Sequence, residues 1–118
     1  ASLTDRSPKN CEQLQVLKYK PGGFYTEHQD AFDLDIEQNY RLYTCIIGLN
    51  DEYAGGETNF PNIKRKYRLG KGDVLVFNTL NDWDRFTDDA LHSGLPVQSG
   101  EKWICNLWIH KHKFNPMV

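Results

Sequence analysis

The sequence predicts an all-β domain, either a sandwich or a barrel, and three observations lead to this fold class. Short segments rich in β-branched and aromatic residues recur along the chain, as in CIIGL and VLVF. Glycine and proline turn signals separate these segments, whereas helix signals are weak throughout. No repeat or low-complexity linker divides the 118 residues, so we expect residues 1–118 to form a single domain.

We expect strands where apolar residues cluster or alternate, in the order 14–20, 24–28, 41–49, 57–60, 66–69, 73–78, 91–97 and 102–110. The turn signals between them are Pro21-Gly22-Gly23, Asn50-Asp51, Gly55-Gly56, Gly70-Lys71-Gly72 and Ser99-Gly100. Two long acidic loops, residues 29–40 and 78–90, interrupt this series. Long loops on a β scaffold commonly carry function, so we expect functional residues there.

The strands expected at 41–49 and 102–110 are apolar on both faces, so both faces must be covered. One face of the last strand carries Trp103, Cys105 and Leu107. A facing sheet can cover one side, but the chain has almost no helix to cover the other. We therefore expect that supporting N-terminal helices are missing from this chain, or that a partner subunit of a homo-oligomer supplies the cover.

The charge balance limits the classes of partner. A formal net charge of -2 and a pI near 6.1 argue against nucleic acid, because phosphate binding needs a basic surface. We expect the basic cluster Lys64-Arg65-Lys66, followed by Arg68, to be a solvated hairpin tip. No apolar run approaches the roughly 18 residues of a membrane span, so we expect no membrane partner.

The chain has 3 cysteines, Cys11, Cys45 and Cys105, without CxxC spacing. This argues against a disulfide framework and a zinc knuckle, and we expect Cys45 and Cys105 to be buried free thiols. The odd number of unpaired thiols, together with the lack of a visible signal peptide, favours a cytoplasmic location.

The 4 histidines differ in their settings. His28 and Asp30 stand two apart in an extended segment, so both side chains can reach one ion. Such a pair alone is a weak signal, because chance often produces it. His92, at the head of a distant strand, would complete a 2-His-1-carboxylate triad, which binds non-haem Fe(II) and leaves positions open for a chelating co-substrate and O2. We expect His110 and His112, near the end of the chain, to be solvated.

Lys102 begins the last expected strand, on the face that also carries Asn106 and Trp108. A lysine inside a β fold needs an anionic partner, because burying an unpaired ammonium is costly. A dicarboxylate such as 2-oxoglutarate would supply one, with its 2-oxo acid end on iron and its far carboxylate on the ammonium. Taken alone, Lys102 could equally be a surface residue after the Ser99-Gly100 turn.

Four segments cover almost the whole chain with a recognisable set of motifs. They are LQVLKYKPGGFYTEHQD (14–30), RLYTCIIGLNDEYAGGETNFP (41–61), GKGDVLVFNTL (70–80) and DDALHSGLPVQSGEKWICNLWIH (88–110). The motifs are Y-x-x-G before H-x-D, then G-G-x-T-x-F-P, H-S-G-x-P-V and G-x-K. By these motifs the sequence resembles the Fe(II)/2-oxoglutarate-dependent dioxygenases. Within them it is most similar to the catalytic domain of the prolyl 4-hydroxylases.

The resemblance implies a double-stranded β-helix, a cupin-like jelly-roll core, with iron held by His28, Asp30 and His92. It implies that Lys102 binds the distal carboxylate of 2-oxoglutarate with the help of Tyr19. It also implies three residues that line the co-substrate pocket: Thr44, Asn106 and Trp108.

The resemblance further implies that a glycine at position 48 leaves room for the ring of Tyr19, since related hydroxylases can carry a tyrosine there. It is least informative about the substrate. The candidate substrate contacts are Tyr25, Trp83 and Arg85.

The implied activity is hydroxylation of a prolyl residue in a peptide or protein, coupled to decarboxylation of 2-oxoglutarate to succinate and CO2. The implied cofactors are Fe(II), 2-oxoglutarate and O2, with ascorbate as the reductant of the iron. By resemblance, the ER lumen is an alternative location. Two other functions stay open at this point: a 2-oxoglutarate oxygenase that acts on another residue or a small molecule, and a non-catalytic β-barrel binding module.

Overall fold

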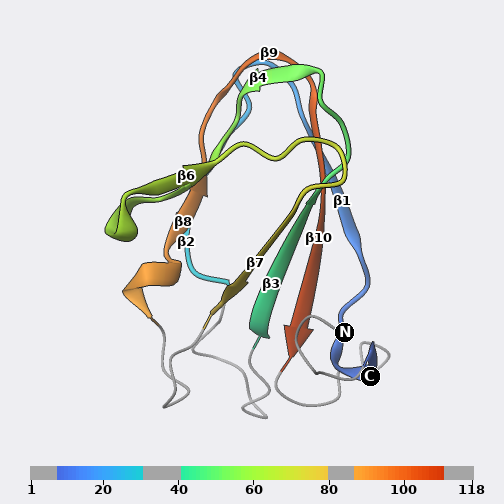
Figure 1. The fold of residues 1–118 in the computed structure, drawn as a ribbon, viewed down its shortest axis with the longest axis vertical. Coiled ribbons are helices and arrows are strands. Elements are labelled where there is room, and N and C mark those ends of the chain that lie inside the picture. Colours follow the sequence, from blue (N-terminus) through green and yellow to red (C-terminus); the bar gives the residue numbers. More distant parts are fainter. Residues whose placement is uncertain (1–7, 31–40, 80–86, 111–118) are drawn as a thin grey trace.

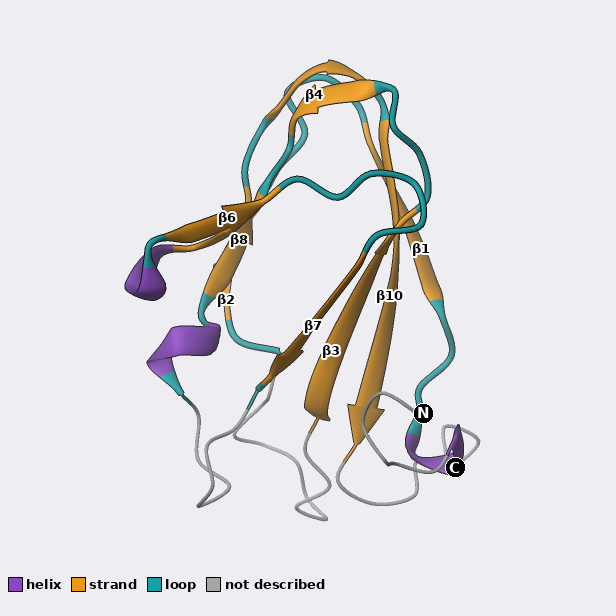
Figure 2. Ribbon diagram, in the orientation of Figure 1, coloured by secondary structure: helices purple, strands orange, loops and turns teal. Residues whose placement is uncertain are grey.

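A computed structural model describes residues 8–30, 41–79 and 87–110. Its elements are short strands and single 3-10 turns (Figure 2). Within these described ranges no helix is long and apolar enough to cross a membrane. In chain order the elements are η1 (Pro8–Asn10), β1 (Gln15–Tyr19), β2 (Tyr25–His28), β3 (Arg41–Gly48), β4 (Tyr53–Gly55), β5 (Thr58–Phe60), η2 (Pro61–Ile63), β6 (Arg65–Tyr67), β7 (Val74–Asn78), η3 (Asp88–Ala90), β8 (His92–Gly94), β9 (Val97–Gly100) and β10 (Lys102–His110).

The strands form two larger sheets and one small one (Figure 1). The first 4-stranded sheet has the order β1-β10-β3-β7, and the second has the order β2-β8-β5-β6. The 2-stranded sheet β4-β9 lies at the end where the larger sheets come together. All pairs are antiparallel, and most neighbours are distant in the sequence. This topology confirms the predicted all-β, jelly-roll type of fold.

Most predicted strands are confirmed to within two residues, and the differences have local causes. The strand predicted at 91–97 is two strands, because β8 ends at Gly94 and Pro96, which lacks an N–H group, separates it from β9. Gly55 and Gly100, from the turns predicted at Gly55-Gly56 and Ser99-Gly100, also take part in the pairing of β4 with β9. Together with Gly56 they keep the positive φ that a turn requires.

The inner face of the first sheet meets a small apolar core. Its buried centre consists of Ile46, Leu69 and Ile104, and Leu75 and Phe77 pack against it. Full burial of one large aliphatic side chain contributes about 1.5–3 kcal/mol. The cluster therefore stabilises the contact between β3, β10 and the segment that leads from β6 to β7.

The outer face of the same sheet carries a row of apolar residues, which the register places side by side: Val16, Cys105, Ile47 and Val74. The two ends of the row are exposed, with 56% of Val16 and 49% of Val74 accessible. Cys105 in the middle is buried, as is Cys45, and both are free thiols as predicted. Cover over this face is therefore partial within the described residues.

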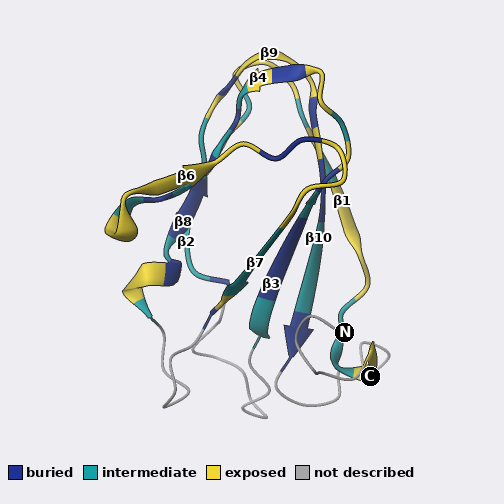
Figure 3. Ribbon diagram, viewed as in Figure 1, coloured by how far each residue is buried: buried dark blue, intermediate teal, exposed yellow. Residues whose placement is uncertain are grey.

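The basic cluster lies on the hairpin of β5 and β6, which projects from the sheets, and β6 is coloured as exposed (Figure 3). Lys64 adopts a left-handed φ of 55° where the chain reverses. Lys64, Arg65 and Lys66 are all exposed. The prediction of a solvated hairpin tip is confirmed for these three residues. Arg68 follows the hairpin and donates hydrogen bonds to the carbonyls of Asp51 and Tyr53, so it is not part of the tip.

Gly48 is required by a close crossing of two backbone segments. A Cβ atom at this position would lie 2.0 Å from the carbonyl oxygen of Gly70. The crossing is tied by a hydrogen bond of 2.9 Å from the N–H of Gly72 to the carbonyl of Gly48. Tyr19 supplies none of the three nearest atoms. The backbone crossing accounts for this glycine, and the expectation that it also makes room for the Tyr19 ring stays a prediction.

We predict that Gly48→Ala lowers the free energy of unfolding by about 3 kcal/mol, because a main-chain carbonyl cannot move aside as the end of a side chain can. Gly94→Ala is the matched control, since its Cβ would meet Tyr25 at an ordinary 3.5 Å. Urea unfolding followed by tryptophan fluorescence measures both variants. Equal unfolding free energies for the two variants would contradict the close crossing.

Candidate metal centre and its pocket

Strands β2 and β8 place two histidines opposite each other. In the antiparallel pair His28 lies opposite His92, and their ring centroids are 4.2 Å apart. Asp30 follows β2 and is only 4% exposed. One ligand atom from each of these three residues lies within 4.8 Å of the others. The geometry therefore brings together the three residues that the sequence singled out as candidate metal ligands.

A backbone carbonyl orients each imidazole. His28 Nδ1 lies 2.8 Å from the carbonyl oxygen of Thr26, and His92 Nδ1 lies 2.9 Å from that of Ala90. A carbonyl oxygen can only accept, so each Nδ1 carries a proton and each Nε2 of the neutral ring presents a lone pair. The Nε2 atoms lie 3.2 Å and 3.6 Å from the carboxylate oxygens of Asp30. Metal-binding histidines are commonly held by such a second partner.

The opposite sheet holds the carboxylate of Asp30. Thr44 on β3 donates its hydroxyl to Asp30 Oδ2 at 2.6 Å. Burial by itself would raise the pKa of Asp30. The hydrogen bond from His28 when its ring is protonated, the charge of His92 and the hydrogen bond from Thr44 outweigh burial, and the pKa falls to about 2. The carboxylate is therefore an anion at neutral pH, as a metal ligand must be.

The two histidines respond differently to this carboxylate. Burial lowers the pKa of His28, but its hydrogen bonds to Asp30 and Thr26 outweigh burial and raise the pKa overall. Burial prevails at His92 and lowers its pKa, although Asp30 opposes this. Two imidazole nitrogens and one carboxylate oxygen form a donor set that fits Fe(II) in a 2-His-1-carboxylate site.

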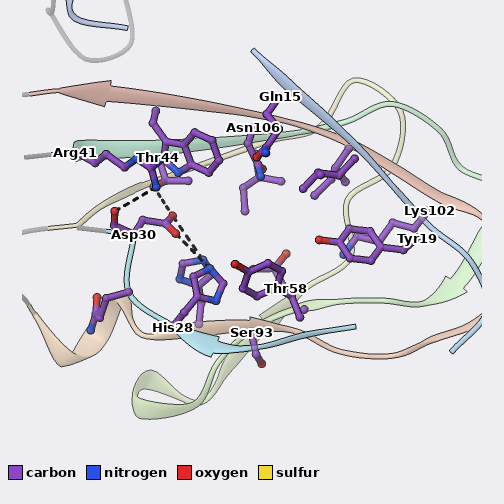
Figure 4. Close-up of a pocket in the computed structure, with 18 of the residues that line it drawn as sticks. Gln15, Tyr19, His28, Asp30, Arg41, Thr44, Thr58, Ser93, Lys102 and Asn106 are labelled. Carbon is purple, nitrogen blue, oxygen red and sulfur yellow. Dashed lines mark hydrogen bonds and ion pairs between the residues drawn. The ribbon is translucent and has the colours of Figure 1, made fainter. Parts of the chain in front are cut away.

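The candidate ligands line a cavity of about 570 Å³ between the two larger sheets. Figure 4 shows His28 and Asp30 at one side of it, and Tyr19 with Lys102 at the other. Strands β1, β3 and β10 supply one wall, and β2, β5 and β8 supply the other. The cavity brings together nine residues singled out in the sequence: Tyr19, Tyr25, His28, Asp30, Thr44, His92, Lys102, Asn106 and Trp108.

Lys102 is buried at the far end, with 4% of its surface exposed. Its Nζ donates to the carbonyl oxygen of Gly56 at 2.6 Å and lies 5.1 Å from the centre of the Tyr19 ring. Burial lowers the pKa of Lys102 to about 8, although the charge of Glu57 opposes this. The alternative that Lys102 is a surface residue is therefore excluded.

Three buried polar atoms of the residues that line the cavity have no hydrogen-bond partner: Gln29 Oε1, Asn106 Oδ1 and Trp108 Nε1. Two of them belong to β10, on Asn106 and Trp108. Both residues share the inner face of β10 with Lys102. Buried polar groups are normally paired, so these two atoms indicate a polar ligand in the cavity.

A largely buried polar cluster beside the cavity was not predicted from the sequence. Arg41 stacks on the Trp108 ring at 4.0 Å and pairs with Glu12 at 2.7 Å, and Glu12 in turn meets His110 Nε2 at 2.6 Å. Burial raises the pKa of Glu12, but hydrogen bonds from His110 and Arg41 outweigh burial and lower it overall. The expectation that His110 is solvated is wrong. Side-chain alternation along β10, which puts His110 on the same face as Trp108, could have revealed this.

Buried Thr58 of β5 and Ser93 of β8 also line the cavity and were not predicted. Both stand at fixed positions of the motifs G-G-x-T-x-F-P and H-S-G-x-P-V, and this signal could have singled them out. Trp83, Arg85 and His112 lie outside the described residues, so their expected settings stay predictions.

Residues 14–110 match the family described as the 2OG-Fe(II) oxygenase superfamily. The chain is 41% identical to a candidate prolyl 4-hydroxylase of Acanthamoeba polyphaga mimivirus, with 90% of this chain and 48% of that protein covered. It is 34% identical to prolyl 4-hydroxylase subunit alpha-3 of Rattus norvegicus, with 95% of this chain and 22% of that protein covered. The chain thus spans about half, or less, of the length of these relatives.

Solved structures agree with the sequence relatives. One of them is a viral collagen prolyl hydroxylase from Paramecium Bursaria Chlorella virus-1, solved as a 2OG complex. It superposes with a TM-score of 0.78 at 39% identity, and the match covers 88% of this chain and 61% of the viral chain. A Pseudomonas putida prolyl-4-hydroxylase superposes with a TM-score of 0.66 at 22% identity and covers 92% of this chain and 57% of its own. The second likeness shows the shared fold alone.

We predict that the His28–Asp30 pair stabilises the metal-free protein in a bounded pH window. The pKa of Asp30 is depressed, so its contribution is present above the ordinary value of 3.8 and is lost as the pH falls toward about 2. The pKa of His28 is raised, so its contribution is present below the ordinary value of 6.5 and is lost as the pH rises through the folded value.

In chelator-treated protein, His28→Gln should therefore lower the unfolding free energy more at pH 5 than at pH 8, as measured by urea titration. The same substitution in an Asp30→Asn background is the control, and there the pH dependence should disappear. An equal loss at both pH values in the otherwise native chain would show that the pair contributes nothing.

Proposed function

The chain belongs to the 2OG-Fe(II) oxygenase superfamily, and on that premise we propose that it is the catalytic domain of a prolyl 4-hydroxylase. It would hydroxylate a prolyl residue in a peptide or protein and convert 2-oxoglutarate to succinate and CO2. The observation that carries the proposal is the convergence of His28, Asp30 and His92 in one cavity with the buried ammonium of Lys102. The proline-directed activity is supported by the names of the relatives.

We assign the metal to the Nε2 atoms of His28 and His92 and to the carboxylate of Asp30. When bound there, Fe(II) supplies the activation of O2 that hydroxylation needs, with 2-oxoglutarate as co-substrate and ascorbate as the reductant that maintains the ferrous state. The chain's own part is orientation. The backbone partners of Nδ1 keep both lone pairs directed at the ion, and Thr44 fixes the carboxylate by its hydrogen bond.

The other end of the cavity would hold the co-substrate. Lys102 supplies a positive charge for the distal carboxylate, and the Tyr19 ring covers the ammonium. Asn106 and Trp108 offer an amide oxygen and an indole N–H that lack partners within the fold. Ile46 and Ile104 add apolar lining, so the cavity restricts water around the bound acid.

We assign the substrate side to the mouth beside Tyr25. This residue is 50% exposed, and its ring centroid lies 4.3 Å from that of His28. An exposed aromatic ring next to a metal site suits contact with a prolyl ring, which is apolar and rigid. Trp83 and Arg85 remain proposed substrate contacts on the strength of the resemblance.

The outer face of the β1-β10-β3-β7 sheet is proposed to be covered in the working protein, by a helical segment or by a second copy of the chain. Support comes from the exposed apolar residues Val16 and Val74, and from Trp103, which is 37% exposed on the same face. The proline-containing substrate does not depend on this cover, because the cavity opens between the sheets.

Metal binding tests the ligand assignment. With Fe(II) and 2-oxoglutarate added without oxygen, the protein should show the weak visible charge-transfer absorption of the chelate. His92→Ala should abolish the band because it removes one of three protein ligands. Cys105→Ala is the control, as it also shortens a buried side chain but lies on the outer face. A folded native protein without the band would overturn the assignment.

Turnover tests the substrate. Incubation with Fe(II), 2-oxoglutarate, ascorbate, O2 and proline-rich peptides should add one oxygen to proline, with one succinate formed for each hydroxyproline. Mass spectrometry of the peptide and assay of succinate measure the two products. His92→Ala should form neither. Succinate without a modified prolyl residue would indicate that the oxygenase acts on a different substrate.

A further inference from the structure

Gly56 lies directly against the buried lysine of the cavity. It follows β4, has a φ of +66°, and its carbonyl oxygen accepts the hydrogen bond from Lys102 Nζ at 2.6 Å. A Cβ atom at this position would lie 3.1 Å from Lys102 Cδ and 3.1 Å from Val97 Cγ2. Gly56 therefore affects the lysine in two ways. Its carbonyl accepts a hydrogen bond from the ammonium, and any side chain at this position would press against the lysine stem.

The ammonium depends on this contact because it has few others. Among the described residues, no carboxylate lies within ion-pair distance of Lys102 Nζ, although the charge of Glu57 acts on its pKa. Tyr19 offers the face of its ring at 5.1 Å. An ammonium has three N–H donors, and the Gly56 carbonyl takes one, which leaves two for a ligand.

We propose that Gly56 is a positioning residue that gives the cavity its preference for a 2-oxo acid with a second carboxylate. Its carbonyl fixes the direction of the Lys102 ammonium. Because it has no side chain, it makes no tight contact with the methylene stem of the lysine. This inference rests on the proposed function, since it concerns the co-substrate of the same site. It assigns to the Gly55-Gly56 pair a role in acid recognition, beyond its place in the turn.

The backbone conformation favours glycine at this position. A φ of +66° is left-handed, and an L-residue there is strained. A side chain would also push the Lys102 stem, because one neighbour of the added atom is the Cδ of that lysine. Strain alone lowers stability, whereas displacement of the lysine weakens only those ligands that carry a distal carboxylate. This difference separates a positioning role from a structural one.

The test compares two ligands of the metal-loaded protein. With Mn(II) in place of Fe(II), calorimetric titration gives the dissociation constants of 2-oxoglutarate and of 2-oxopentanoate, which has the same chain length but ends in a methyl group. In the native protein 2-oxoglutarate should bind more tightly. Gly56→Ala should weaken 2-oxoglutarate by about tenfold or more, the size expected when a charge-assisted hydrogen bond is misplaced. It should leave 2-oxopentanoate nearly unchanged.

Gly72→Ala is the matched control. Its φ is +88°, so it carries the same left-handed strain, but nothing lies within 4 Å of the added Cβ. It should lose similar stability in thermal unfolding and keep the native ratio of the two dissociation constants. If Gly56→Ala does not fold, Gly56→Ala with Val97→Ala relieves the contact with Val97 and keeps the contact with Lys102. Val97→Ala alone is then its control, and the same loss of discrimination is expected.

The outcomes separate this inference from the proposed function. A native protein that binds 2-oxoglutarate selectively, with a folded Gly56 variant that keeps the native ratio, overturns the role of Gly56 and leaves the proposed function standing. A native protein that binds neither acid with the metal present overturns both. Weakening of both acids to the same extent also overturns the inference, because it indicates a general loss of structure.

Discussion

The buried carboxylate of Asp30 is the interaction on which the rest of the site depends. It joins the two larger sheets, because it accepts the Thr44 hydroxyl from β3 and faces the imidazoles of His28 and His92 on β2 and β8. Burying an anion without partners costs several kcal/mol, so the carboxylate is tolerated only while both sheets contribute. The spacing of the candidate metal ligands is therefore a consequence of how the sheets pack.

The cavity has opposite charges at its two sides. At one side, the carboxylate of Asp30 and the two imidazoles can bind a cation. At the other side, the ammonium of Lys102 can bind an anion. Asn106 and Trp108 of β10 also line the cavity, each with a polar atom that has no partner. A molecule that chelates a metal at one end and carries a carboxylate at the other matches this arrangement. The fit of 2-oxoglutarate thus follows from the distribution of charged and polar groups in the cavity, independently of the likeness to known oxygenases.

Contacts outside the candidate ligand set support the strands that carry the site. Gly48 permits the approach of the Gly70 carbonyl that shapes the end of β3. Beside the cavity, the Arg41–Glu12–His110 cluster fixes the Trp108 ring from the other side, because the guanidinium stacks on it at 4.0 Å. The site is therefore held from both ends of β10 by contacts outside the candidate ligand set.

The sequence by itself determined the strand pattern, the fold class and the residue types of the metal cluster, because alternation, turn residues and the His28-x-Asp30 spacing are local signals. Only the tertiary structure decided that Lys102 is buried, that His110 belongs to an ion cluster and that Gly48 serves a backbone crossing. The physical reason is register: no local pattern states which residue of β8 lies opposite His28, and a slip of one residue would turn His92 to the other face.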